Sequence, residues 1–173
     1  MPIVPDTKNW TWVLERPCPE CGFDASTVEF RSVPAITRRN ALEWMPVLER
    51  PDVRQRPDDG TWSPLEYAAH TRDVFRVFAG RLRLMLESDD PAFENWDQDA
   101  TAMADRYGEQ DPAVVAAELR DAADTLADAF ERVPDSALDR TGRRSDGSVF
   151  TVLTLARYYV HDPVHHLWDV RPR

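Results

Sequence analysis

Hydrophobic residues recur at the three- to four-residue spacing of an amphipathic helix in four long stretches of the chain. Pro, Gly, Asp and Ser residues gather between these stretches and break the pattern. Few positions alternate between hydrophobic and polar residues, as they would in a half-buried strand. The pattern therefore predicts four helices, which span residues 27–48, 65–87, 113–132 and 148–170.

Capping residues mark the starts of two of these helices. Ser63, followed by Pro64 and Glu66, matches a capping box with proline at the first helical position. Asp111 and Pro112 mark the start of the third helix in the same way. Because these signals are independent of the hydrophobic spacing, they define the second and third helices best.

The segments between the predicted helices differ in length. Residues 50–61 are predicted to form a loop, and residues 135–148 a turn or a short hairpin. Residues 91–110 form a long connection with room for a short helix over 97–106. A connection of this length is typical of a lid over a site or of a crossover in a bundle.

The predicted fold class is all-α, with a four-helix bundle formed by residues 26–173. A non-helical leader, residues 1–25, precedes the bundle and contains a Cys-x-x-Cys pair. The leader also contains Trp10 and Trp12, and aromatic residues of this kind favour a segment that packs on the body of the protein.

Composition and charge narrow the classes of partner. The 173 residues are enough for one domain with its own core. The net charge is −10, from 31 acidic and 21 basic residues, and a field of this sign repels the phosphate backbone of nucleic acids. No run approaches the ~20 apolar residues of a membrane span, and the first residues lack the pattern of a secretory signal. We therefore expect a cytoplasmic protein with no nucleic-acid or membrane partner.

Three of the four histidines lie close together, within residues 158–166. His161 and His165 are four positions apart, so a helix places both imidazoles on one face. Aromatic and apolar residues share that face, and His70 lies on a similar hydrophobic stripe of the second predicted helix. His166 points roughly 100° away from His165 and is predicted to support the site or lie on the surface.

Three inward-facing imidazoles require partners, because a buried imidazole without one loses its hydration. One divalent cation would satisfy all three and would keep a coordination position open for water or substrate. We therefore predict a metal site formed by His70, His161 and His165. Hydrogen-bonded core histidines, in a protein that only binds a partner, remain the alternative.

The histidine segments resemble the DinB/YfiT-like superfamily of four-helix metal-binding proteins. The resemblance is carried by Trp-Ser-Pro-Leu-Glu-Tyr-Ala-Ala-His at residues 62–70 and His-Asp-Pro-Val-His at residues 161–165, and it extends over about residues 27–170. It implies an up-down-down-up bundle, a homodimer, and zinc or nickel bound by His70, His161 and His165.

The resemblance also implies a choice of functions. Members include transferases and isomerases that use a low-molecular-weight thiol such as mycothiol or bacillithiol. The implied function is a metal-dependent S-transferase, isomerase or hydrolase that acts on a small molecule. The alternative is a non-catalytic protein that binds a metal or a small molecule.

The pair Cys18 and Cys21 lies outside the part of the chain that carries this resemblance. A Cys-x-x-Cys pair can supply half of a zinc site; the other half is missing from this chain, although two chains of a dimer could supply four thiolates. A redox pair and a tight turn with two reduced thiols are the other interpretations. A disulfide framework is not expected from one pair in a chain of this size.

Charged residues outside the histidine cluster supply further candidates. Asp97 and Asp99, in the long connection, could reach the metal as a fourth ligand or a base. Arg143 and Arg144, before the last helix, could bind an anionic substrate. For all four residues, a solvated position on the surface remains the alternative.

Overall fold

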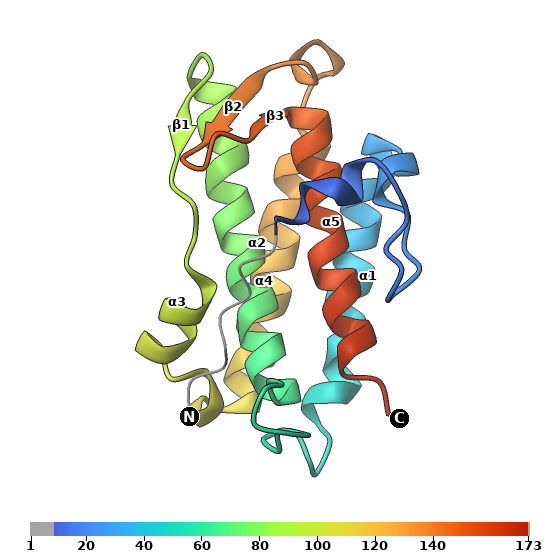
Figure 1. Ribbon diagram of the computed structural model, residues 1–173, viewed down its shortest axis with the longest axis vertical. Coiled ribbons are helices and arrows are strands. Elements are labelled where there is room, and N and C mark those ends of the chain that lie inside the picture. Colours follow the sequence, from blue (N-terminus) through green and yellow to red (C-terminus); the bar gives the residue numbers. More distant parts are fainter. Residues whose placement is uncertain (1–8, 173) are drawn as a thin grey trace.

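A computed structural model describes residues 9–172 of the chain, and four long helices form its body (Figure 1). Helix α4 packs against α1 and α2, and α5 packs against the same two helices from the other side. The four predicted helices are therefore confirmed. They are α1 (Val33–Leu48), α2 (Pro64–Glu87), α4 (Pro112–Glu131) and α5 (Val152–Asp169).

The start of each helix follows from local chemistry. Ser63 and Glu66 form the predicted capping box of α2, and Asp111 caps α4 by accepting a hydrogen bond from Ala113 N. Helix α5 begins four residues later than predicted, at a second capping box formed by Thr151 and Thr154. Helix α1 also begins late, because 3₁₀ turns (Ala25–Thr27 and Phe30–Ser32) occupy the preceding residues.

The core lies between the four long helices and is rich in aromatic residues. Trp44 and Tyr159 are fully buried, and the ring of Tyr159 contacts those of Phe78 and Phe130. The hydroxyl of Tyr159 lies 3.1 Å from that of Thr37, which gives the buried phenol a polar partner. The central turns of α5 are thus fixed against the other helices.

A small three-stranded sheet covers one end of the bundle, where the sequence pattern predicted only a turn or hairpin. The strands are β1 (Ala92–Phe93), β2 (Thr141–Arg144) and β3 (Val149–Thr151). β2 and β3 are antiparallel, whereas β1 joins β2 in parallel. The all-α prediction is corrected to a mostly helical fold with a small sheet, because strands of two to four residues are too short to give an alternating signal.

Gly142 of β2 packs where no side chain fits. A Cβ atom at this position would lie 2.7 Å from Met85 Cγ and 2.9 Å from Phe93 Cε1, and Met85 is fully buried. We expect Gly142→Ala to lower the free energy of unfolding by ~1–3 kcal/mol, as overpacking does. Urea denaturation would measure this change in the free energy of unfolding. Gly80→Ala is the control. Among residues 9–172, apart from the backbone of its own helix, no atom lies within 4 Å of a Cβ at this position, so this change within α2 should stabilise the protein by up to ~1 kcal/mol.

The two irregular segments both pack against the long helices, the connection after α2 against α2 and the leader against α5. The connection after α2 contains α3 (Gln98–Ala104) and lies beside α2 in Figure 1. The prediction of a non-helical leader is corrected, because the leader contains a 3₁₀ helix (Trp10–Leu14) whose first turn is capped by the side chain of Asn9. This helix contacts α5, as the tryptophans led us to expect. Residues 1–8 of the predicted leader lie outside the described residues. Within residues 9–172, none of the helices has the length and apolar character needed to cross a membrane.

Candidate metal centre

Four candidate ligands lie along two faces of α5. His161 and His165 are one helical turn apart, and so are Asp162 and His166. Because neighbouring residues of a helix differ by about 100° in direction, the two pairs cannot point to the same place. Helix α5 therefore supplies donors to two separate groups.

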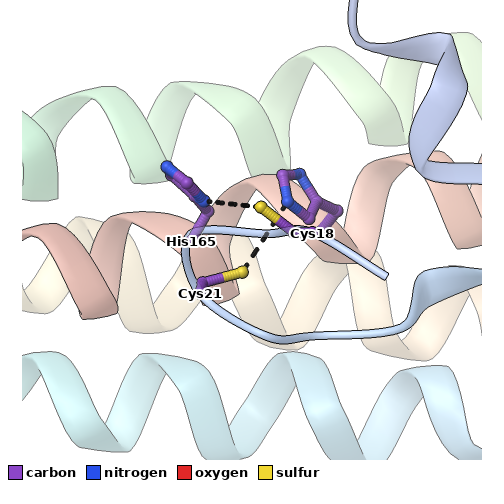
Figure 2. Close-up of side chains that lie close together, drawn as sticks. Cys18, Cys21 and His165 are labelled. Atoms are coloured by element: carbon purple, nitrogen blue, oxygen red, sulfur yellow. Dashed lines mark hydrogen bonds between the residues drawn. The ribbon is translucent and has the colours of Figure 1, made fainter. Parts of the chain in front are cut away.

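The first group joins α5 to the leader, and we call it the Cys/His cluster: Cys18, Cys21, His161 and His165 (Figure 2). Cys18 Sγ lies 3.6 Å from His165 Nδ1, and Cys21 Sγ lies 3.8 Å from His161 Nε2. One donor atom from each of the four residues lies within 4.8 Å of all the others. Both cysteines project from one tight loop toward α5, as Figure 2 shows for the labelled residues.

The second group joins α5 to α2, and we call it the His/Asp cluster: His70, Asp162 and His166. Asp162 Oδ1 lies 3.5 Å from the Nε2 atoms of both His70 and His166. The rings of the two histidines have centroids 4.9 Å apart. The ring of Trp96, from the connection after α2, stacks on His70 with centroids 5.2 Å apart.

Among the described residues, the three predicted ligands His70, His161 and His165 do not lie in one group. The structure places His161 and His165 with the two cysteines, and His70 with Asp162 and His166. The sequence prediction missed Asp162 as a donor and gave His166 only a supporting role. The offset by one residue between the two i, i+4 pairs was the signal that could have separated them.

The His/Asp cluster contains buried polar atoms that lack hydrogen-bond partners among the described residues. They are both ring nitrogens of His70 and Oδ1 of Asp162. Such atoms are costly to bury unless something satisfies them. The donors thus fit a divalent cation, which takes imidazole nitrogen and carboxylate oxygen together.

The protonation states of the imidazoles and of Asp162 suit metal binding, because ligands must be deprotonated to bind a cation. Burial raises the pKa of Cys21 to about 11, so this thiol would release its proton when it binds a cation. Burial lowers the pKa of His70, and burial together with the nearby His165 lowers the pKa of His161 to about 4. Burial raises the pKa of Asp162, but the charges of His166 and His70 outweigh that effect and hold it well below its usual range. At neutral pH, His70 and His161 are neutral and Asp162 is ionised.

A pocket of about 530 Å³ opens beside both clusters. Asp162, His166, His161 and His165 reach its wall, and so does Trp10 of the leader. Asp97 and Asp99 also line it, as the sequence analysis allowed. Other lining residues come from α2, the connection after it, β2 and α5: Val74, Phe78, Arg81, Trp96, Arg144 and Tyr158.

Two guanidinium groups give one side of the pocket a positive charge. Arg81 and Arg144 are both buried, and burial together with the neighbouring charge of Arg144 lowers the pKa of Arg81 to about 10. Arg144 Nη1 donates to the hydroxyl of Tyr158 at 3.0 Å, while Nε of Arg144 has no hydrogen-bond partner among residues 9–172. Arg144 Nη2 also pairs with Asp146 Oδ2 at 2.7 Å, and Asp146 lines the pocket, so an anionic substrate would have to compete with this carboxylate for Arg144. Arg143 pairs with Asp90, and its side chain is 57% exposed. Only the second of the two predicted arginines therefore reaches the pocket.

The fold and this site define a helical-bundle protein with candidate metal-binding groups beside a small-molecule pocket. The chain belongs to the DinB superfamily, whose model matches residues 35–170. It is similar in structure to YfiT from Bacillus subtilis, described as a probable metal-dependent hydrolase with an unusual four-helix bundle topology. That match has a TM-score of 0.67 and 18% sequence identity, over 90% of this chain and 89% of the other. No curated protein matches the chain.

Proposed function

We propose that this chain is a metal-dependent hydrolase of a small anionic substrate, with one divalent ion held by His70, Asp162 and His166. The observation that carries the proposal is the set of buried donor atoms of His70 and Asp162 that have no hydrogen-bond partner within residues 9–172. They lie in a cluster whose Asp162 and His166 reach the pocket wall. Membership of the DinB superfamily and the likeness to YfiT support the same activity.

The donor set suits a catalytic ion better than a structural one. Two imidazoles and one carboxylate leave coordination positions open, as in catalytic zinc sites. Zinc and nickel both accept these donors. When bound, the ion would supply Lewis acidity and lower the pKa of water in the site.

The chain's own residues would bind and orient the substrate. Arg81 and Arg144 can hold a carboxylate or phosphate group, because their guanidinium groups lie buried at the pocket wall. Trp96 covers one face of His70 and excludes water from that side. Asp97 and Asp99 are the carboxylates of the pocket that could accept a proton during hydrolysis.

Metal removal tests the activity. Protein reconstituted with zinc or nickel should hydrolyse small esters or amides that also carry a free carboxylate group. Chelation should reduce the rate to that of the uncatalysed reaction, and added metal should restore it. Full turnover by metal-free protein would contradict the proposal, and metal binding without turnover would favour a non-catalytic binding protein.

Arg144→Gln tests the class of substrate. The loss of a charge-assisted hydrogen bond should lower kcat/KM about 10- to 100-fold for the anionic member of a matched substrate pair, with little change for the neutral member. Arg143→Gln is the matched control, because its side chain pairs with Asp90 away from the pocket wall. An equal effect of the two variants on both substrates would exclude anion recognition by Arg144.

A thiol-dependent transferase remains a prediction of the family resemblance. A low-molecular-weight thiol, added to the same assay, would form a thioether or thioester product if the chain catalysed transfer.

We further propose the up-down-down-up topology that the resemblance implies. In Figure 1 the sequence colours run downward along α1 and α5 and upward along α2 and α4, which supports this arrangement.

A further inference from the structure

We propose that Cys18, Cys21, His161 and His165 bind a zinc ion in a closed tetrahedral site, distinct from the ion of the proposed hydrolase. This site would fasten the leader to α5. It does not depend on the proposed hydrolase activity.

The distances in the Cys/His cluster match those of a zinc site. With Zn–S of ~2.3 Å and Zn–N of ~2.0–2.1 Å, the edges of a tetrahedron between donor atoms are about 3.3–3.8 Å. The two measured S···N distances are 3.6 and 3.8 Å. One ion can therefore be reached by all four donors with only small adjustments of the side chains.

The local backbone presents both sulfur atoms to the same side. Gly22 follows the pair with a φ of +74°, a left-handed conformation that favours glycine, and its N–H donates to Cys18 O at 2.9 Å. Cys18 N in turn donates to Phe23 O at 2.9 Å. This tight loop, together with two histidines four apart on a helix, reproduces the Cys-x₂-Cys and His-x₃-His spacing of Cys₂His₂ zinc sites.

Carboxylates orient His165 from its outer side. Its Nδ1 faces Cys18, while its Nε2 lies 3.6 Å from a Glu20 oxygen and 3.7 Å from an Asp169 oxygen. Histidines that bind zinc usually donate their second ring nitrogen to a carboxylate, and these two carboxylates lie within a few tenths of an ångström of that contact. A pair of histidines that merely packed in the core would not need this arrangement.

Charge and burial favour zinc bound to both thiolates. Cys18 and His161 are buried, and two thiolates with two neutral imidazoles neutralise a divalent cation. Four protein donors leave no open position, so the site would be structural. Trp10 packs against His161 and His165 with ring centroids 5.6 Å apart in both cases, and it lines the pocket. Zinc at this site would thereby fix one wall of the pocket.

Metal analysis combined with cobalt spectroscopy tests the site. In the full chain, cobalt should give an intense thiolate-to-cobalt charge-transfer absorption that persists in Asp162→Asn. Cys18→Ser should lower the zinc bound per chain by about one equivalent and weaken that absorption, whereas Asp162→Asn should lose the ion of the other site.

Two results would overturn the proposal. The first is cobalt-loaded wild-type protein without a thiolate charge-transfer band, which stays informative even if the cysteine variant fails to fold. The second is a zinc content that Cys18→Ser leaves unchanged.

Discussion

Asp162→Asn is expected to lower the hydrolytic kcat/KM by ~100-fold or more while the chain stays folded. Asp162 is the one anionic donor of the His/Asp cluster, and an asparagine oxygen is a much weaker ligand. Because Asn has the same shape as Asp, the packing of α5 should persist. Circular dichroism would check the fold, and metal content with steady-state kinetics would measure the loss.

Asp121→Asn is a suitable control for that substitution. It removes the same charge, but from an exposed carboxylate on α4. The thiolate-to-cobalt absorption should be unaffected in both variants. Wild-type turnover by Asp162→Asn would remove the His/Asp cluster from the mechanism.

Asp73→Ala should cost ~3–5 kcal/mol of stability, because it would remove the buried anionic partner of Arg72 and leave only the partly exposed Glu118 to pair with it. Asp73 accepts hydrogen bonds from Nε and Nη2 of Arg72 at 3.0 and 2.9 Å, and from the hydroxyl of Tyr107 at 2.6 Å. All three residues are buried. The network joins α2 to the connection after it, where Trp96 covers His70. Urea denaturation would measure the loss.

Glu118→Ala provides the comparison, because Glu118 also pairs with Arg72 but its side chain is 40% exposed. We expect a cost of ~1 kcal/mol or less for an exposed pair. A similar cost for the two substitutions would show that the buried network is not the source of the effect.

The same network should make the free energy of unfolding depend on pH in the acidic range. Burial raises the pKa of Asp73, but hydrogen bonds from Arg72 and Tyr107 outweigh it and hold the pKa below its usual value. A carboxyl whose folded pKa is lowered binds fewer protons than in the unfolded chain. Its contribution is therefore complete above about pH 4 and is lost as the pH falls through the lower folded pKa.

The long helices could be predicted from the sequence because their signals are local. The capping box at Ser63 and the Asp-Pro start of α4 occupy adjacent positions in the chain, and hydrophobic spacing covers the rest. The parallel pairing of Ala92 with Arg143 depends on residues about fifty positions apart, so no local pattern announces it. The late start of α5 has the same origin, because β3 takes the residues before it.

Most residues of the candidate site could be predicted from the sequence, but which of them lie together could not. The sequence singled out His70, His161, His165 and the cysteine pair, and the structure places all of them in two candidate metal groups. Which face of α5 meets α2 and which meets the leader is decided by packing between segments that lie about 90 and 140 residues apart in the chain. The homodimer, the cytoplasmic location and the thiol cosubstrate stay predictions.

The positions of the four donors on α5 restrict the insertions that this helix can accept. Inserting one residue between the capping Thr151 and His161 would rotate every later side chain by about 100°. The pair that meets the cysteines would then turn away from them, and both groups would lose their geometry together. A change of length in a surface loop does not rotate a helix in this way. We therefore expect the spacing from the cap of α5 to its four donors to tolerate insertions and deletions poorly.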